Sequence, residues 1–153
     1  MTKIEAFIKF VNCSRRRTAI VFIEDEMKAT INEFKTHHVQ VIDASDWATD
    51  KIVFSDIELI DIILSSSLGQ TTLIINIELF LAPRFEDKIF LQNFLQRLMA
   101  TEPLQPIFIL FYSKILYEKF KKFYKHNIPT ENHFLESSTK LLIFIVLKLY
   151  FSL

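Results

Sequence analysis

The feature that most constrains the fold is a regular alternation of short apolar runs with longer amphipathic stretches. The runs are rich in β-branched and aromatic residues and are apolar on both faces; they cover residues 19–23, 39–43, 72–77 and 106–112. Strands that are apolar on both faces are typical of parallel sheets covered by helices on both sides. The runs therefore predict the central strands of an α/β protein.

Helical patterns fill the intervals between these runs. Phe90, Phe94 and Leu98 recur at a spacing of four, and Ser55 and Glu58 have the spacing of a capping box. The expected helices cover residues 3–12, 26–36, 55–66, 86–101 and 114–126. Strands that alternate with helices indicate βαβ units. We expect a three-layer, doubly wound parallel sheet of four to five strands, with helices on both faces.

The length of the chain indicates one domain. Residues 1–153 supply one core of ordinary size, because half of them are apolar. Residues 137–153 contain an apolar strand or helix that belongs to the core or to an interface. Its most hydrophobic part spans about thirteen residues and contains Lys148, whereas a membrane helix needs roughly twenty apolar residues. We therefore expect no membrane span, and the single Cys13 favours a reducing cytoplasm.

The charge balance limits the partners that a global electric field could attract. The charges of eighteen basic and eighteen acidic residues cancel, so a nucleic acid could be bound only by a local patch of basic residues. The candidate residues for such a patch are Arg15, Arg16, Arg17, Lys119 and Lys122. The alternative is that the lysines form the solvated face of an amphipathic helix whose apolar face docks on the sheet.

Acidic residues follow the first two expected strands. A parallel sheet binds ligands outside the carboxyl ends of its strands, and Glu24, Asp25 and Asp43 stand at such ends. Carboxylates are ligands for hard cations, so these three residues are a candidate Mg²⁺ site for a metal-dependent phosphatase or nuclease. The alternative is a solvated acidic rim with no bound cofactor.

Two other nucleotide or phosphate chemistries conflict with the sequence. Gly69 is the only glycine, so a glycine-rich phosphate loop is excluded, and the acids after the first strand would repel nucleotide phosphates. Asn76 stands where a phosphorelay receiver would carry its acceptor aspartate, and an amide cannot form an acyl phosphate. A pseudo-receiver signalling domain remains as an alternative.

The order of several segments resembles a known family. These segments are "FIEDEM", "VQVIDASDW", "SSSLGQTTLIINIELFL", "PIFILFYSK" and "EKFKKFYKH". Together they resemble the first domain of the AAA+ clamp-loader delta subunit, which has a short acidic turn instead of a Walker A loop. "IELFLAP" with its following helix also resembles the small P-loop protein of bacteriophage-exclusion defence systems, although this chain lacks that family's Walker A motif. The resemblance covers roughly residues 17–126 and implies an ATP-silent adaptor with a P-loop-like fold, in a DNA replication or phage-defence complex.

A protein partner is the expectation that follows. Trp47, in the loop after the second strand, is either an exposed hot spot for binding a protein partner or a buried side chain that covers the end of the sheet. Phe144 and Val146 are further candidate partner contacts in the apolar terminal run. We expect a non-catalytic adaptor or regulatory subunit, with the metal-dependent enzyme and the pseudo-receiver as alternatives.

The terminal run yields a first prediction. Burial of six large side chains in residues 141–153 contributes on the order of 10 kcal/mol before entropy is subtracted, and this exceeds the net stability of many domains. A chain that ends at Thr139 should therefore be insoluble or molten, as checked by solubility and near-ultraviolet circular dichroism. A truncated chain that stays soluble, monomeric and folded but loses its partner would instead identify the run as an interface.

Overall fold

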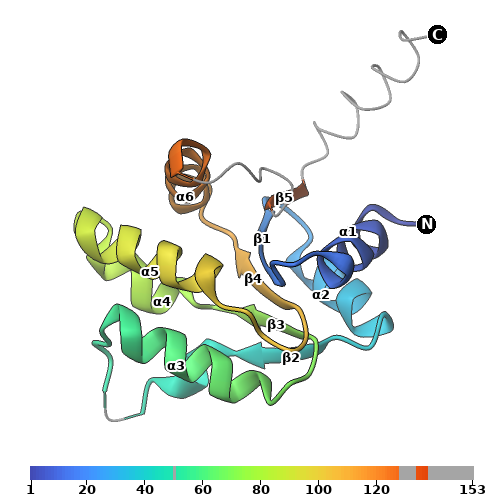
Figure 1. The fold of residues 1–153 in the computed structure, drawn as a ribbon, viewed down its shortest axis with the longest axis horizontal. Coiled ribbons are helices and arrows are strands. Elements are labelled where there is room, and N and C mark those ends of the chain that lie inside the picture. The colour runs from blue at the N-terminus through green and yellow to red at the C-terminus, as the bar shows by residue number, and fades with distance from the viewer. Residues whose placement is uncertain (50, 128–133, 138–153) are drawn as a thin grey trace, which may run out of the picture.

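A parallel sheet forms the centre of the computed structural model, which describes residues 1–49, 51–127 and 134–137 (Figure 1). Within those residues the sheet has five strands, namely β1 (Thr18–Ile23), β2 (Gln40–Asp43), β3 (Thr72–Ile75), β4 (Ile107–Phe111) and β5 (Phe134–Ser137). Their order across the sheet is β2-β3-β4-β1-β5, and each neighbouring pair is parallel. The predicted α/β fold with a parallel sheet is confirmed.

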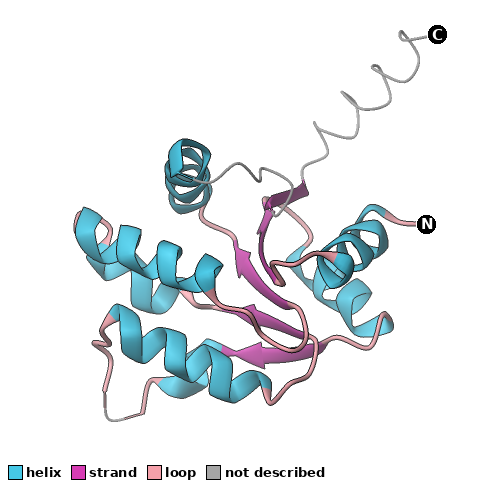
Figure 2. Cartoon of the chain, in the orientation of Figure 1, coloured by secondary structure: helices cyan, strands magenta, loops and turns pink. Residues whose placement is uncertain are grey.

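Helices cover both faces of this sheet (Figure 2). One face carries α1 (Lys3–Cys13) and α2 (Met27–Thr36). The other face carries α3 (Asp56–Ser67), α4 (Glu78–Leu81), α5 (Lys88–Ala100) and α6 (Lys114–Asn127). The chain moves one way from β1 to β2 and the other way in every later crossover, and right-handed crossovers then place the helices on opposite faces. The result is the expected three-layer, doubly wound arrangement.

The nine predicted elements lie within two residues of the observed boundaries. The capping box that was expected at Ser55 and Glu58 forms in both directions and starts α3. The expected third strand ends early, because Asn76 has a φ of 63° and leaves the extended conformation. Short elements that were not predicted are α4, β5 and two 3₁₀ turns, η1 (Ala44–Trp47) and η2 (Ala82–Arg84).

The apolar terminal run, residues 141–153, lies outside the described residues, and so do Phe144 and Val146. Within the described residues, the fifth strand of the sheet is β5 (Phe134–Ser137), which pairs with β1. No helix of the described part of the chain is long and apolar enough to cross a membrane.

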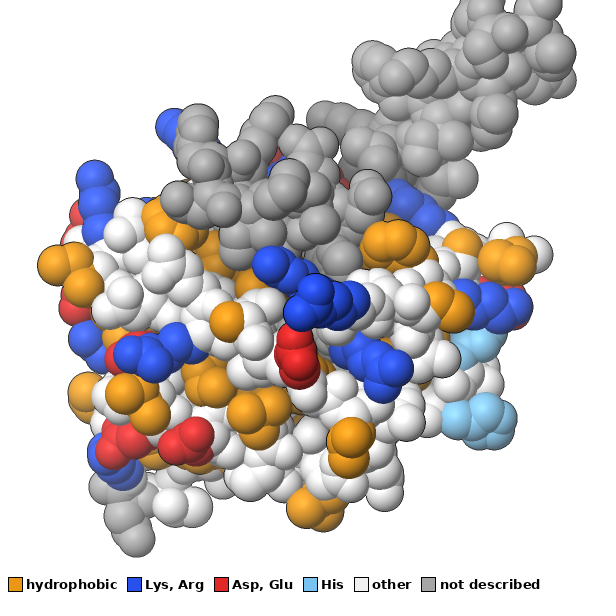
Figure 3. All heavy atoms as spheres, in the orientation of Figure 1, with side chains coloured by type: hydrophobic (Ala, Val, Ile, Leu, Met, Phe, Trp, Pro, Cys, Tyr) orange, Lys and Arg blue, Asp and Glu red, His pale blue; other side chains and the backbone are white. Residues whose placement is uncertain are grey.

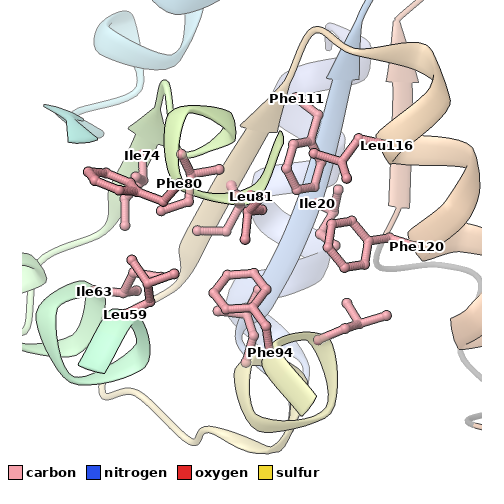
Figure 4. Close-up of a cluster of buried hydrophobic side chains, with 14 of the residues drawn as sticks. Ile20, Leu59, Ile63, Ile74, Phe80, Leu81, Phe94, Phe111, Leu116 and Phe120 are labelled. Carbon is pink, nitrogen blue, oxygen red and sulfur yellow. The ribbon is translucent and has the colours of Figure 1, made fainter. Parts of the chain in front are cut away.

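Two hydrophobic clusters hold the helices to the sheet. Alternate residues of β4 point to opposite faces, as the pleat of a strand requires. Phe111 stacks on Phe120 of α6 with ring centroids 5.4 Å apart, within the cluster that α3 to α6 share with the sheet (Figure 4). On the opposite face, the ring of Phe108 contacts Phe7 of α1 and Phe34 of α2. The ring centroids are 5.7 Å apart for Phe7 and 5.3 Å apart for Phe34.

The position of Phe108 generates a prediction. Phe108→Ala should lower the free energy of unfolding by about 3–5 kcal/mol, because it removes a fully buried ring that holds both helices of one layer. Urea unfolding measures the loss. Ile89→Ala, at an exposed position of α5, is the control and should change stability by less than about 0.5 kcal/mol. Equal small losses in both variants would contradict the packing described for this face.

Candidate functional site

The candidate site lies at the end of the sheet where the parallel strands finish, which we call the carboxyl edge. The loops that follow β1, β3 and β4 start there. The winding of the chain reverses between β4 and β1, because their following helices lie on opposite faces. In open α/β sheets such a reversal opens the crevice in which ligands bind. The acidic turn after β1 and the first residues after β3 and β4 therefore surround the position to inspect.

Asp43 joins the loop after β2 to the loop after β3. Its Oδ1 atom accepts hydrogen bonds from Asn76 Nδ2 at 2.8 Å, from the Ser45 backbone N–H at 2.9 Å and from the Ser45 hydroxyl at 2.7 Å. Partial burial raises the pKa of Asp43, but the bonds from Asn76 and Ser45 outweigh burial and leave the pKa below its ordinary value. Asp43 is thus held as an ionised acceptor that fixes two loops.

Glu78 joins the loop after β3 to the loop after β4. It is buried, with 4% of its surface exposed, and its Oε1 atom accepts the backbone N–H groups of Tyr112 and Ser113, each at 2.9 Å. Burial raises the pKa of Glu78, although the two N–H groups act in the opposite direction. The pKa of the Tyr112 hydroxyl is also raised, first by burial and then by the charges of Glu78 and Asp43.

These two carboxylates link three neighbouring loops in series. Their hydrogen bonds go to the protein's own backbone and side chains, as buried or partly buried polar groups require. From the sequence, Asn76 was considered only as the residue at the acceptor position of a receiver, and Glu78 was not singled out. The signal was a glutamate inside the apolar run "IINIELFLA", where a charge needs a partner.

The candidate metal residues are not brought together. Glu24 and Asp25 are exposed after β1, whereas Asp43 follows β2, and β3 and β4 lie between those strands. Three strand spacings separate β1 from β2 by about 14 Å, too far for the two ends to share one ion. Among the described residues, no group of three or more His, Cys, Asp or Glu side chains is arranged to hold a metal ion.

The candidate basic patch is divided between two places in the fold. Arg15, Arg16 and Arg17 precede β1, at the amino edge of the sheet. Arg15 lies 3.9 Å from the carboxylate of Glu102, and Arg17 donates a hydrogen bond to the Leu104 carbonyl. The face in Figure 3 shows basic side chains in separate groups among acidic and hydrophobic ones.

The two candidate lysines, Lys119 and Lys122, lie on α6, which starts at the carboxyl edge of the sheet. Lys119 donates to the Phe85 carbonyl at 2.7 Å, and its ammonium group lies 3.9 Å from the centre of the Phe85 ring. Lys122 is exposed. Lys119 therefore has a packing role within the fold, which sequence spacing alone could not indicate.

Apolar side chains follow several of the strand ends. Trp47 is half-buried and stacks on Phe80 of α4 with ring centroids 6.3 Å apart, so its exposure lies between the two cases considered from the sequence. Exposed apolar residues at this edge include five from the loop before α3, from α4, from the residues after β4 and from the start of α6; we call Ile52, Val53, Leu79, Tyr112 and Ile115 the apolar rim. Large exposed apolar patches are typical of interaction sites.

Comparison with known proteins assigns no family, since no family model, no curated protein and no solved structure matches the chain. The strand order can still be compared with general fold rules. The dinucleotide-binding fold has the order 3-2-1-4-5-6, and the flavodoxin-like fold of response-regulator receivers has 2-1-3-4-5. Here β1 lies between β4 and β5, so the order differs from both. The pseudo-receiver alternative gains no support from this topology.

The raised pKa of Glu78 predicts a pH dependence of stability. Between its ordinary value of 4.5 and its raised value in the folded state, the folded protein binds more protons at this site than the unfolded chain. The contribution of Glu78 to the free energy of unfolding must therefore fall as pH rises through this interval. Urea unfolding of the wild type and of Glu78→Gln across pH should give a difference that falls from pH 4.5 upward and then levels off.

The same substitution at the exposed Glu118 controls for the loss of one carboxylate. A difference that rises with pH would mean that the backbone N–H groups outweigh burial at Glu78, and would contradict the assignment.

Proposed function

We propose that this chain is a non-catalytic adaptor or regulatory subunit that binds a protein partner at the carboxyl edge of its sheet. The observation that carries the proposal is the contrast between the polar and the apolar groups of that edge. Asp43 Oδ1 and Glu78 Oε1 accept hydrogen bonds from within the protein, whereas the apolar rim is exposed. An edge of this kind offers apolar contact area to a partner.

The fixed loops favour binding in a second way. Asp43 and Glu78 connect the loops after β2, β3 and β4, and thereby hold Leu79, Tyr112 and Ile115 on one framework. A surface that is ordered before binding loses less conformational entropy when the partner docks. Trp47, next to Phe80, adds an aromatic group of the type that dominates interface energetics.

The acidic turn supports the ATP-silent part of the proposal. Glu24, Asp25 and Glu26 are exposed between β1 and α2, where a P-loop-like domain would wrap a phosphate. Glu26 precedes α2 in a left-handed conformation with φ of 60°, and its side chain makes no capping bond. Three carboxylates at this helix start oppose nucleotide phosphates. We place the adaptor in a cytoplasmic assembly for DNA replication or phage defence, with a P-loop-like fold that has lost its phosphate loop.

Substitution of the rim tests the partner site. Full-length tagged protein incubated in extract of the native host should capture a stoichiometric partner, measured by quantitative mass spectrometry. Ile115→Glu should reduce capture at least about tenfold, because it places a charge among the apolar contacts. Ile115 is 69% exposed, so the fold should be unaffected.

Leu104→Glu is the matched control. Leu104 is 78% exposed but lies between α5 and β4, at the amino edge of the sheet, so capture should be unchanged. Equal capture by both variants, or a solitary monomer in every fraction, would contradict the proposed site. Tight binding of Mg·ATP in calorimetry would contradict the ATP-silent part.

A further inference from the structure

A groove between α5 and α6 lies apart from the carboxyl-edge site. It has a volume of about 330 Å³ and is lined by Lys88, Leu91, Gln92, Lys119, Phe120, Lys122 and Phe123. The side chains of Leu91 and Phe120 are buried and form the floor. Beneath the floor, the ring of Phe94 lies 6.2 Å from that of Phe120 and joins the two helices. This groove between the helices is therefore apolar at its base.

The rim of this groove is basic and carries no acid. Lys88 begins α5, and Lys119 and Lys122 lie on successive turns of α6. Lys119 is held against Phe85. No acid of the described residues lies within ion-pair distance of Lys88 or Lys122. The chain as a whole has a net charge of zero, so this concentration of positive charge is local.

We propose that the groove binds an acidic amphipathic segment of a protein partner. One face of that segment inserts apolar side chains between Leu91, Phe120 and Phe123, and flanking carboxylates meet Lys88 and Lys122. A volume of about 330 Å³ is at the lower limit of ordinary ligand pockets and accommodates one or two large side chains. The arrangement of an apolar anchor with charges beside it is that of a helix docked in a groove.

The aromatic geometry favours a peptide over a nucleic acid. Single-stranded nucleic acids bind to basic grooves by stacking bases on exposed aromatic faces. Phe120 is 2% exposed, and its ring is already stacked on Phe111. Phe123 is half-buried against the same cluster. The floor thus offers a hydrophobic surface for aliphatic side chains, whereas flat stacking would require rings that project into solvent.

This proposal rests on the proposed function only in that both concern a protein partner, and its test uses a different probe. The probe is a synthetic, fluorescently labelled peptide in which leucines recur at helical spacing among glutamates. Binding to the full chain is measured by fluorescence anisotropy. The double variant Lys88→Glu, Lys122→Glu should weaken binding at least about tenfold, since it turns two attractive contacts into repulsive ones.

Three controls make the test specific. Lys28→Glu changes the charge at an exposed site on α2, on the opposite face of the sheet, and should leave affinity within about twofold of the wild type. A peptide with lysines in place of the glutamates, and one with serines in place of the leucines, should each bind at least about tenfold more weakly.

Several outcomes would overturn the proposal: no binding of the acidic peptide at millimolar concentration, equal binding of the lysine peptide, or equal loss in Lys28→Glu. A single-stranded oligonucleotide that binds more tightly than the peptide, and is displaced by the groove variants, would replace it with a nucleic-acid site. None of these results changes the outcome expected for Ile115→Glu, so the two proposals fail independently.

Discussion

The burial of β1 on both faces and along both edges is the constraint on which the rest of the structure depends. All six residues of this strand are buried, and it hydrogen-bonds to β4 on one side and β5 on the other. At the carboxyl end of β1 the chain turns into α2, on the face that also carries α1, whereas the helices that follow β2, β3 and β4 lie on the other face. The acidic residues that follow β1 are exposed in that turn.

The chemistry of the carboxyl edge follows from how its loops are held. A glycine-rich loop would fix its own shape with backbone contacts to a bound phosphate, but this chain has one glycine and holds its loops with carboxylates. Asp43 and Glu78 are therefore structural acceptors. Their hydrogen bonds connect the loops after β2, β3 and β4.

Local patterns predicted the elements, but not which elements become neighbours. The capping box at Ser55 depends on residues three positions apart, so it was readable from the sequence. The contact of Asp43 with Asn76 depends on β2 pairing with β3, and no local pattern reports this. The candidate metal residues show the same limit: Glu24 and Asp25 follow β1 and Asp43 follows β2, and their sequence positions did not report that β3 and β4 lie between these strands. The groove was missed because periodicity showed one apolar face on α6 but not how much of that face α5 would cover.

The position of β1 also determines the order in which the chain can fold as it is synthesised. Thr18 pairs with Ile107 and Ile20 pairs with Phe134, so both neighbours of the first strand are made long after it emerges from the ribosome. Until then the segment "TAIVFI" has two unpaired edges, which can template aggregation. Pairings this distant in sequence form slowly because loop closure costs entropy before any contact is gained. We therefore expect this strand to be the segment of the nascent chain that is most exposed to aggregation until β4 and β5 have been synthesised.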